Sequence, residues 1–309
     1  MKIWFITGAS RGFGALIAER ALQRGDAVVA TARNPKSVTE RFGTHPNLLA
    51  LPLDVTDEAQ AHAAAKAAVE RFGRIDVLLN NAGFGLLGAV EEASAAEVEA
   101  LYRTNVFGLL AVTRAVLPHM RRQRAGRILN ISSIGGYRGV AGFGVYSSTN
   151  FAVEGLTEAL AGEVGPLGIH VTAVEPGYFR TDFLDSTSLS VSSVQIDDYA
   201  ATAGSVRHKA TQINHAQPGD PSKLAQVLVD FVDAPKPPVR LPLGSDTVAA
   251  IEGKHSDDAA LVAEWRAVSV STDFAEVGAV GDSLSIRFAP PSIGETGTAQ
   301  RRGRAVARG

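Results

Sequence analysis

A glycine-rich turn between a short apolar run and the start of a helix restricts the fold of this chain more than any other stretch. Residues 3–6 are apolar, residues 7–14 read Thr-Gly-Ala-Ser-Arg-Gly-Phe-Gly, and an apolar helical pattern begins at residue 15. Glycine adopts backbone angles closed to other residues and places no Cβ between the main chain and a neighbour. A helix that starts here points free N–H groups at an anion. The stretch therefore predicts a strand–turn–helix unit that can seat a phosphate.

Apolar strands alternate with helical patterns along most of the chain. Strands are predicted at residues 3–6, 27–31, 48–53, 75–79, 127–131, 170–174 and 239–241. Helical patterns are predicted at residues 57–72, 95–123 with a break near Thr104, 147–164, 221–233, 245–252 and 256–269, with Trp265 as a packing anchor. Apolar strands that alternate with amphipathic helices indicate an α/β fold, with a doubly wound parallel sheet of about seven strands covered on both faces.

Composition narrows the class of protein. The chain has 309 residues, a formal net charge of −2 and no cysteine. This charge gives no electrostatic reason to expect a nucleic-acid or membrane partner. No apolar run approaches the roughly 18–20 residues that span a bilayer. Met1 and Lys2 lead directly into the first strand, which leaves no room for a signal-peptide core. We expect a cytoplasmic protein.

The chain divides unequally. Residues 1–271 carry the alternating pattern and are predicted to form one catalytic domain. Residues 272–309 are rich in Gly, Ser, Pro and Arg and end in a basic stretch. Low hydrophobicity at that end indicates partial disorder. Within this carboxyl-terminal extension, residues 277–288 have some strand character.

Ligands of such sheets bind at the carboxyl ends of the strands, where the strand order reverses. That rule places the following residues along one edge: Gly8 to Gly14, Asp54, Asn80 to Gly83, Ser132, Ser133, Pro176 and Gly177. Several motifs of different strands thus converge on one place, which favours a ligand site over an ordinary glycine-rich loop.

The same motifs, in this order, resemble the short-chain dehydrogenase/reductase family in its compact form. The matching stretches are Thr7-Gly-x-x-x-Gly-x-Gly14, Asp54-Val55, Asn80-Asn81-Ala82-Gly83, Asn105-Val106, Ser133, Tyr146 and Pro176-Gly177. The resemblance covers roughly residues 3–271 and implies a single Rossmann-type domain. Residues 175–182 more narrowly resemble bacterial members similar to hydroxysteroid dehydrogenases.

The end of the second strand bears on the choice of cofactor. It reads Thr31-Ala32-Arg33, without the carboxylate that usually accepts from the ribose 2′-hydroxyl of NAD. Arg33 and Arg11 are cations suited to a 2′-phosphate, because guanidinium binds phosphate as a planar charged fork. The sequence predicts NADP(H); the competing interpretation is that both arginines are solvated loop residues.

The resemblance implies further cofactor contacts. Asp54 would hold the adenine amino group, and Asn81 to Gly83 would line the adenine ribose. The full set of implied cofactor-binding residues is Gly8, Ser10, Arg11, Gly12, Phe13, Gly14, Arg33, Asp54, Val55, Asn81, Ala82, Gly83, Tyr146, Asn150, Pro176, Gly177 and Thr181.

Reduction of a ketone by hydride transfer builds negative charge on the carbonyl oxygen, which needs a proton donor and a hydrogen-bond donor. Ser133 and Tyr146 are 13 positions apart, the separation typical of the family's serine–tyrosine pair. The resemblance implies that Tyr146 gives the proton, that Ser133 polarises the carbonyl, and that Asn105 holds a water in a proton relay.

The chief departure from the family is Asn150, which stands where the motif Tyr-x-x-x-Lys has its lysine. Four residues along a helix place Tyr146 and Asn150 on one face. A cation about 5 Å from a phenol, at an effective dielectric of about 20, favours phenolate by roughly 3 kcal/mol. That equals about two pKa units. Asn150 can bind a ribose hydroxyl but cannot supply this charge.

These residues leave two functions open and argue against a third. The first is an NADP(H)-dependent reductase of a ketone or aldehyde, or the reverse dehydrogenase, impaired by Asn150. The second is a non-catalytic NADP(H)-binding sensor or scaffold. An epimerase or dehydratase of the extended family predicts another glycine spacing and a larger carboxyl-terminal domain, and neither is present.

Residues 182–219 are expected to cover the site as a lid, because long loops in compact domains are usually functional. Residues 134–143 are expected to form the opposite wall, which suggests a partly apolar carbonyl or alcohol substrate. The seven histidines are scattered, so no metal site is predicted. The resemblance implies a homodimer or homotetramer through the helices at residues 105–123 and 147–164.

Overall fold

The computed structural model describes residues 1–274. Its centre is a seven-stranded sheet in the order β3-β2-β1-β4-β6-β7-β9, with every neighbouring pair parallel. The strands are β1 (Ile3–Ile6), β2 (Ala27–Ala32), β3 (Leu48–Pro52), β4 (Val77–Asn80), β6 (Gly126–Ile131), β7 (Ile169–Pro176) and β9 (Arg240–Leu243). The predicted doubly wound α/β fold is therefore confirmed, with strand ends shifted by a few residues. The order reverses between β1 and β4, which places a ligand site beside the glycine turn.

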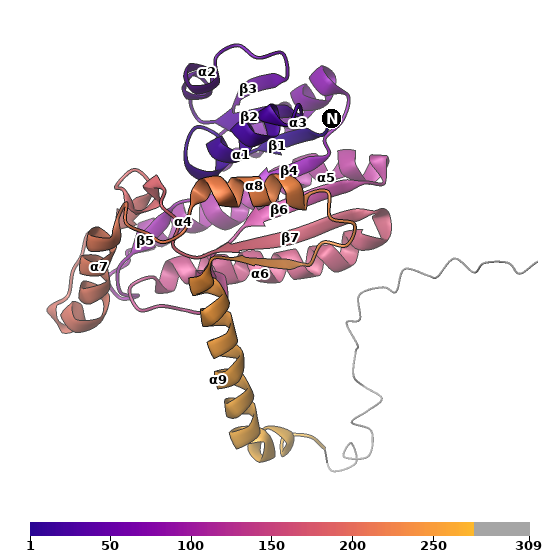
Figure 1. Ribbon diagram of the computed structural model, residues 1–309. Helices are drawn as coiled ribbons and strands as arrows, with labels where there is room; N and C mark the ends of the chain where they lie inside the picture. Colours follow the sequence, from indigo (N-terminus) through magenta and orange to yellow (C-terminus); the bar gives the residue numbers. More distant parts are fainter. Residues whose placement is uncertain (275–309) are drawn as a thin grey trace, which may run out of the picture.

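Helices cover both faces of the sheet (Figure 1). The helices are α1 (Gly12–Gln23), α2 (Lys36–Phe42), α3 (Glu58–Phe72), α4 (Ala95–Tyr102), α5 (Leu109–Gln123), α6 (Gly144–Val164), α7 (Ser205–Ile213), α8 (Pro221–Phe231) and α9 (Ser245–Val270). Trp4 and Ile6 of β1 pack with α1 and α8, whereas Phe5 between them packs with α3 and α5. Alternate side chains of one strand thus enter two separate apolar cores, as a doubly covered strand requires.

Residues 182–219, the segment expected to cover the site and called the lid below, contain short helices and a strand rather than a plain loop. The three-residue strand β8 (Leu189–Val191) pairs in parallel with β5 (Gly85–Leu87), which follows β4. Both strands were missed, because three residues carry too short a pattern to predict. The pairing attaches the lid to the segment that directly follows strand β4 of the main sheet.

Helix α9 differs from its prediction. The two helical patterns at residues 245–252 and 256–269 belong to one continuous helix, since the single Gly253 costs only about 1 kcal/mol and ends nothing. Figure 1 shows α9 extending away from the sheet. Trp265 is 52% exposed, so its expected role as a packing anchor within this chain is wrong.

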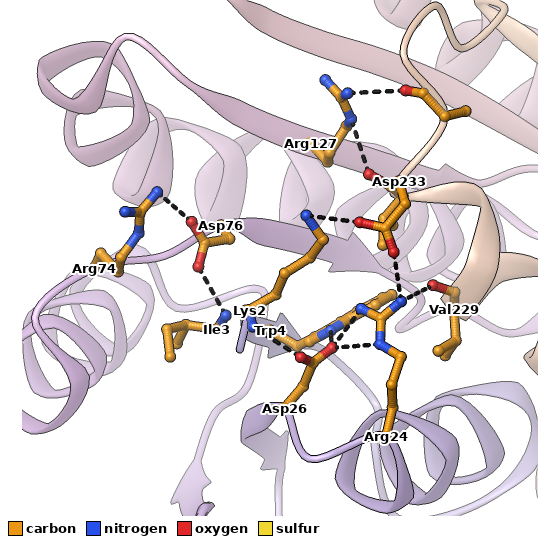
Figure 2. Close-up of polar contacts among 12 residues, drawn as sticks. Lys2, Ile3, Trp4, Arg24, Asp26, Arg74, Asp76, Arg127, Val229 and Asp233 are labelled. Atoms are coloured by element: carbon orange, nitrogen blue, oxygen red, sulfur yellow. Dashed lines mark hydrogen bonds and ion pairs between the residues drawn. The ribbon is translucent and has the colours of Figure 1, made fainter.

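Charged residues close the amino-terminal edge of the sheet (Figure 2). Asp26, which is 4% exposed, accepts hydrogen bonds from the Lys2 backbone at 2.8 Å, the Trp4 indole at 3.0 Å and Arg24 Nε at 2.9 Å. Asp233 pairs with Lys2 at 3.0 Å and with Arg24 at 2.8 Å. These contacts tie the starts of β1 and β2 to the segment after α8.

None of the helices in residues 1–274 combines the length and apolar character that crossing a membrane requires. The extension predicted for residues 272–309, including the strand-like residues 277–288, lies outside the described residues except for its first three.

Candidate active site

A cavity of about 1060 Å³ lies at the carboxyl ends of the parallel strands. This volume is at the upper end of the range for small-molecule sites. All of the predicted site residues except Gly14 line it. They are Gly8, Ser10, Arg11, Gly12, Phe13, Arg33, Asp54, Val55, Asn81, Ala82, Gly83, Asn105, Ser133, Tyr146, Asn150, Pro176, Gly177 and Thr181. The fold thus brings the separate sequence motifs together around one cavity.

The glycines of the first turn are required for different reasons: backbone conformation at Gly8 and Gly12, and close packing at Gly14. Gly8 and Gly12 have φ of +65° and +54°, a region that favours glycine. A Cβ on Gly14 would lie 2.4 Å from the Gly8 carbonyl oxygen and 2.6 Å from Asn81 Nδ2. Gly14 therefore lets α1 pack against the turn and does not line the cavity. No side chain caps the start of α1 at Gly12, which leaves backbone N–H groups for an anion.

Asn81 holds the glycine turn in place. Its Nδ2 donates to the carbonyl oxygens of Thr7 at 2.9 Å and Gly8 at 3.0 Å. Thr7 Oγ1 accepts in turn from the backbone N–H groups of Asn81 and Ala82 at 2.9 and 3.0 Å. The side-chain amide of Asn81 is thus used within the protein, and the cavity wall here is formed beside it by Ala82 and Gly83.

At the far end of the cavity, Arg33 is exposed and follows β2 directly. Asn34 and Ser37 line the cavity beside Arg33 and were not among the predicted residues. Arg11 donates from Nη2 to the carbonyl oxygen of Thr187 in the lid at 2.5 Å. Arg11 therefore joins the glycine turn to the lid, whereas Arg33 follows the carboxyl end of the neighbouring parallel strand β2.

Asp54 and Val55 follow β3 on the same edge. Asp54 accepts hydrogen bonds from the backbone and hydroxyl of Thr56 at 3.0 and 2.7 Å through one oxygen. Its other carboxylate oxygen makes no hydrogen bond to a described residue. Val55 is buried and packs where Gly108 leaves room, since a Cβ there would lie 2.6 Å from it.

Ser133 and Tyr146 lie at the other end of the cavity. Ser133 follows β6 by one residue, and its Oγ accepts from the Gly135 N–H at 3.1 Å. Tyr146 lies in the first turn of α6. Its ring packs between those of Phe143 and Phe183, with centroids 6.0 and 5.6 Å away. The aromatic neighbours fix the ring beside the serine hydroxyl.

The environment of the Tyr146 phenol opposes its ionisation. Burial raises the pKa of Tyr146 above its ordinary value of 10.0, while hydrogen bonding with Asn150 and Ser133 acts in the opposite direction. Asn150 is 6% exposed and also donates from Nδ2 to the Tyr146 carbonyl oxygen at 2.9 Å. A neutral amide therefore occupies the place from which a lysine would lower this pKa.

Asn105 lies in a π-helical turn, Arg103–Gly108, between α4 and α5. This turn coincides with the break predicted near Thr104, and π-turns are frequent at functional sites. Asn105 Oδ1 accepts from the Phe84 N–H at 3.1 Å, and Nδ2 donates to the Phe84 carbonyl at 2.9 Å. Both ends of its side-chain amide thus hold the segment after β4.

The lid is fastened to the segment between β5 and α4. Arg207 Nη1 lies 2.6 Å from Glu92 Oε2, and the Ile196 N–H donates to Glu92 at 2.9 Å. The hydrogen bond from Arg207, with those from Ile196 and Ala89, lowers the pKa of Glu92 to about 2. Glu92 therefore stays ionised at neutral pH, and its ion pair with Arg207 holds the lid at that pH.

Two aromatic residues of the site, Phe183 in the lid and Phe179 just before it, were not predicted from the sequence. Phe183 lies against the Tyr146 ring, and Phe179 packs edge-on against Phe13 of the glycine turn at 5.6 Å. The only local signal was the aromatic content of the residues after Gly177. Their contacts depend on how the lid folds back over the sheet.

The residues present fit an extended dinucleotide. The cavity runs from free N–H groups at the start of α1, past the glycine-bounded backbone, to Ser133 and Tyr146. Gly8 and Gly12 line this part of the cavity without a Cβ, and Gly14 lets α1 approach the turn closely. Among residues 1–274, no cluster of three or more His, Asp or Glu is arranged to hold a metal ion.

Known proteins place the chain in a family. A family profile described as short chain dehydrogenase matches residues 2–191. The chain belongs to this family. Oxidoreductase BOA17 of Botryotinia fuckeliana is 40% identical over 275 residues, which cover 88% of this chain and 99% of that protein. The 3-ketodihydrosphingosine reductase of Bacteroides thetaiotaomicron is 40% identical over 244 residues, 79% of this chain and 88% of that protein.

Solved structures of the family agree with the fold. A short-chain dehydrogenase from Streptomyces avermitilis has 42% identity and a TM-score of 0.82, over 88% of this chain and all of that one. ElxO with NADP bound has 28% identity and a TM-score of 0.66, over 80% of this chain and 99% of that one. The predicted membership of the short-chain dehydrogenase/reductase family is thus confirmed.

Proposed function

We propose that this protein binds NADP(H) and interconverts a ketone or aldehyde with its alcohol, at a rate limited by Asn150. The observation that carries the proposal is the shared cavity. Ser133 and Tyr146 line the same space as the glycine turn of α1, at its opposite end. A protein that only bound a nucleotide would have no chemical need for this serine–tyrosine pair.

The preference for NADP(H) rests on Arg33 and Arg11. No carboxylate follows β2 to accept from a ribose 2′-hydroxyl, and Arg33 lines the cavity there instead. The relative ElxO is described with NADP bound, which supports the assignment. A 3-ketoacyl-(acyl-carrier-protein) reductase from Brucella melitensis, with 27% identity, is described with NADH. The choice between the cofactors therefore depends on the arginines of this chain.

In the proposed reaction the bound nicotinamide nucleotide supplies or accepts the hydride. Tyr146 gives its phenolic proton to the oxygen of the substrate, and Ser133 donates a hydrogen bond to the same oxygen. Phe143 and Phe183 hold the phenol and limit its contact with water. Asn105 would hold a water of the proposed relay, and its side chain is fixed by Phe84 at both ends and by Thr149 Oγ1 at 3.5 Å.

Asn150 weakens this chemistry without removing the site. Burial raises the pKa of Tyr146, and the amide offers one hydrogen bond but no positive charge to offset it. The surrounding residues of α6 are those of an active family member. A single lysine-to-asparagine replacement in an active parent is therefore the simplest account of this sequence.

The test is to measure NADPH oxidation by Asn150→Lys and by the wild-type chain with a panel of ketones and aldehydes. We expect the lysine to raise the rate on the order of a hundredfold, the lower end of the range for general acid–base catalysis. Asn150→Gln, which lengthens the side chain without adding charge, is the matched control and should gain nothing. An equally inactive Asn150→Lys that still binds NADPH would favour the second candidate, a non-catalytic NADP(H)-binding sensor or scaffold.

We further propose an apolar ketone as the substrate. Val140 and Phe143 line the cavity opposite Phe183 and Leu184 of the lid. The 40% identical relative from Bacteroides thetaiotaomicron is named for a ketone, 3-ketodihydrosphingosine. Ketones that differ only in the length of an apolar substituent would separate this proposal from a polar substrate through their KM values.

A homodimer or homotetramer through α5 and α6 is also proposed. Phe107, in the π-helical turn before α5, is 56% exposed, and Phe151, in the second turn of α6, is 47% exposed. Burial of such rings against a second copy would remove apolar surface from water. Sedimentation of the wild-type chain and Phe151→Glu would test this assembly.

A further inference from the structure

Two buried carboxyl groups lie behind the wall that carries Ser133. Glu154 of α6 is 3% exposed, and Glu175 near the end of β7 is 1% exposed. Glu154 is two helical turns beyond Tyr146. Neither carboxyl group lines the cavity, and the chemistry proposed above uses neither of them.

The two carboxyl groups are near enough to hydrogen bond with each other. With both groups ionised, Ser132 is the one hydroxyl beside Glu154 among the described residues, and no hydrogen-bond donor faces Glu175 Oε1. Ionised carboxylates are acceptors only, whereas a protonated carboxyl is also a donor. One shared proton therefore supplies the hydrogen bond that two anions could not make.

Among residues 1–274, the cation that acts on both carboxyl groups is Arg240. Arg240 of β9 lies with Nε 3.5 Å from Glu154 Oε2, and its Nη2 lies 3.3 Å from the exposed Glu158. The Arg240 guanidinium also stacks over the Tyr137 ring at 5.4 Å, and the Tyr137 hydroxyl contacts His255 of α9. A guanidinium shared in this way can balance one buried carboxylate but not two.

The energetics agree with one proton in the pair. Burial, followed by the negative charge of Glu154, raises the pKa of Glu175 to about 7. Burial also raises the pKa of Glu154, against the Ser132 hydroxyl and Arg240, which lower it. Like charges forced together in a low dielectric titrate as a pair.

The backbone turn of Ser133 rests directly on this pair. A Cβ on Gly136 would lie 2.6 Å from Ser132 Oγ and 3.1 Å from Glu154 Oε1. The Gly136 N–H donates to the Ser133 carbonyl oxygen at 2.8 Å and closes the turn. The Ser132 N–H is fixed to the Val174 carbonyl, one residue before Glu175, at 2.8 Å. A change in the separation of the carboxyl groups therefore acts on the turn.

We propose that Glu154 and Glu175 are positioning residues that share one proton, and that loss of this proton displaces the Ser133 turn and changes the hydrogen bonding of Ser133 with Tyr146. The step is a simple ionisation, in which the proton leaves to water and a second carboxylate remains. The relevance to catalysis rests on the proposed function, but the coupling between the acid pair and Tyr146 does not.

The coupling can be measured without nucleotide or substrate. The full-length chain is labelled with ¹³C at the tyrosine Cζ, and Tyr146→Phe assigns one of its five tyrosine signals. We expect the Tyr146 signal to shift with pH along a single curve with a midpoint near 7. Glu175→Gln, a permanently neutral isostere, should abolish the shift. Ser133→Ala should abolish it as well, because the serine transmits the effect.

Two matched variants test whether the pH-dependent shift of the Tyr146 signal comes from the acid pair or from groups beside it. Glu158→Gln changes the exposed partner of Arg240, and His255→Gln replaces the histidine in contact with Tyr137. Both should keep the curve of the wild-type chain. A Tyr146 signal that ignores pH near neutrality, or a curve that survives in both Glu175→Gln and Glu154→Gln, would overturn the proposal. Neither result bears on whether Asn150→Lys reduces ketones.

Discussion

The two edges of the sheet treat buried polar groups in opposite ways. At the amino-terminal edge, Asp26 receives donors from Lys2, Trp4 and Arg24, and Figure 2 shows the network continuing to Asp233. At the carboxyl-terminal edge, the hydroxyls of Ser132 and Ser147 have no partner in hydrogen-bonding geometry among the described residues. The same seven strands thus end in a satisfied network on one side and in spare hydrogen-bonding capacity on the other.

The difference teaches where stability and function are separated in this fold. Buried polar groups without partners are costly, so native proteins keep few of them away from functional sites. The amino-terminal edge holds strands and α8 together, while the carboxyl-terminal edge keeps polar groups and glycine backbone for a ligand. Changes at the first edge should therefore alter stability, and changes at the second should alter binding and chemistry.

The largest expected effect is at the amino-terminal edge. Asp26→Ala leaves the Trp4 indole, the Lys2 N–H and the Arg24 guanidinium without their acceptor. Removal of one partner from such a buried charged cluster costs about 3 kcal/mol or more of unfolding free energy. Urea denaturation measures the loss, and the folded fraction should bind NADPH as the wild type does. A loss of NADPH affinity without a loss of stability would break the comparison.

An intermediate effect is expected from Gly14→Ala at the other edge. The new Cβ meets the Gly8 carbonyl oxygen and Asn81 Nδ2. These two atoms are hydrogen-bonded to each other and cannot move apart without breaking the turn. We expect about 2 kcal/mol of lost NADPH binding, or roughly a thirtyfold rise in Kd. Gly253→Ala in α9, where no atom lies within 4 Å of the new Cβ, is the control and should leave Kd unchanged. Equal Kd values for the two variants would show that the turn does not hold the nucleotide.

The smallest effect concerns the pH dependence of stability. The raised pKa of Glu175, about 7 against an ordinary 4.5, means that the native state favours the protonated form. Its contribution is complete below about pH 4.5 and is lost as the pH rises through 7. Relative to Glu175→Gln, the wild type should lose roughly 1–2 kcal/mol between pH 5 and 6.5, a loss set by these two pKa values. Parallel unfolding curves across this range would place the proton elsewhere.

Most of the central sheet and the glycine turn could be predicted from local sequence patterns. Buried strands such as β1 and β4 are apolar without interruption, and the glycine turn marks the strand after which the ligand edge begins. The break near Thr104 also corresponds to a structural feature, the π-helical turn that carries Asn105. Such features depend on neighbours in sequence, so a pattern can predict them.

The rest depends on contacts between distant segments. Strand β8 exists because it pairs with β5 about a hundred residues earlier, and neither has enough residues to show a period. Glu175 directly follows the strand predicted at residues 170–174, and its proximity to Glu154 is established only when α6 packs on β7. Trp265 suggested packing from its type alone, whereas the path of α9 leaves it half exposed.

The central claim is that a nucleotide with a 2′-phosphate lies along the cavity, with that phosphate near Arg33. Titration of the wild-type chain and Arg33→Ser with NADPH and NADH, followed by tryptophan emission and melting temperature, tests it most directly. The account predicts that NADPH binds the wild type more tightly than NADH, and that Arg33→Ser weakens NADPH alone by about tenfold or more, the contribution of one charge-assisted hydrogen bond. No response of the folded wild-type chain to either nucleotide would contradict it.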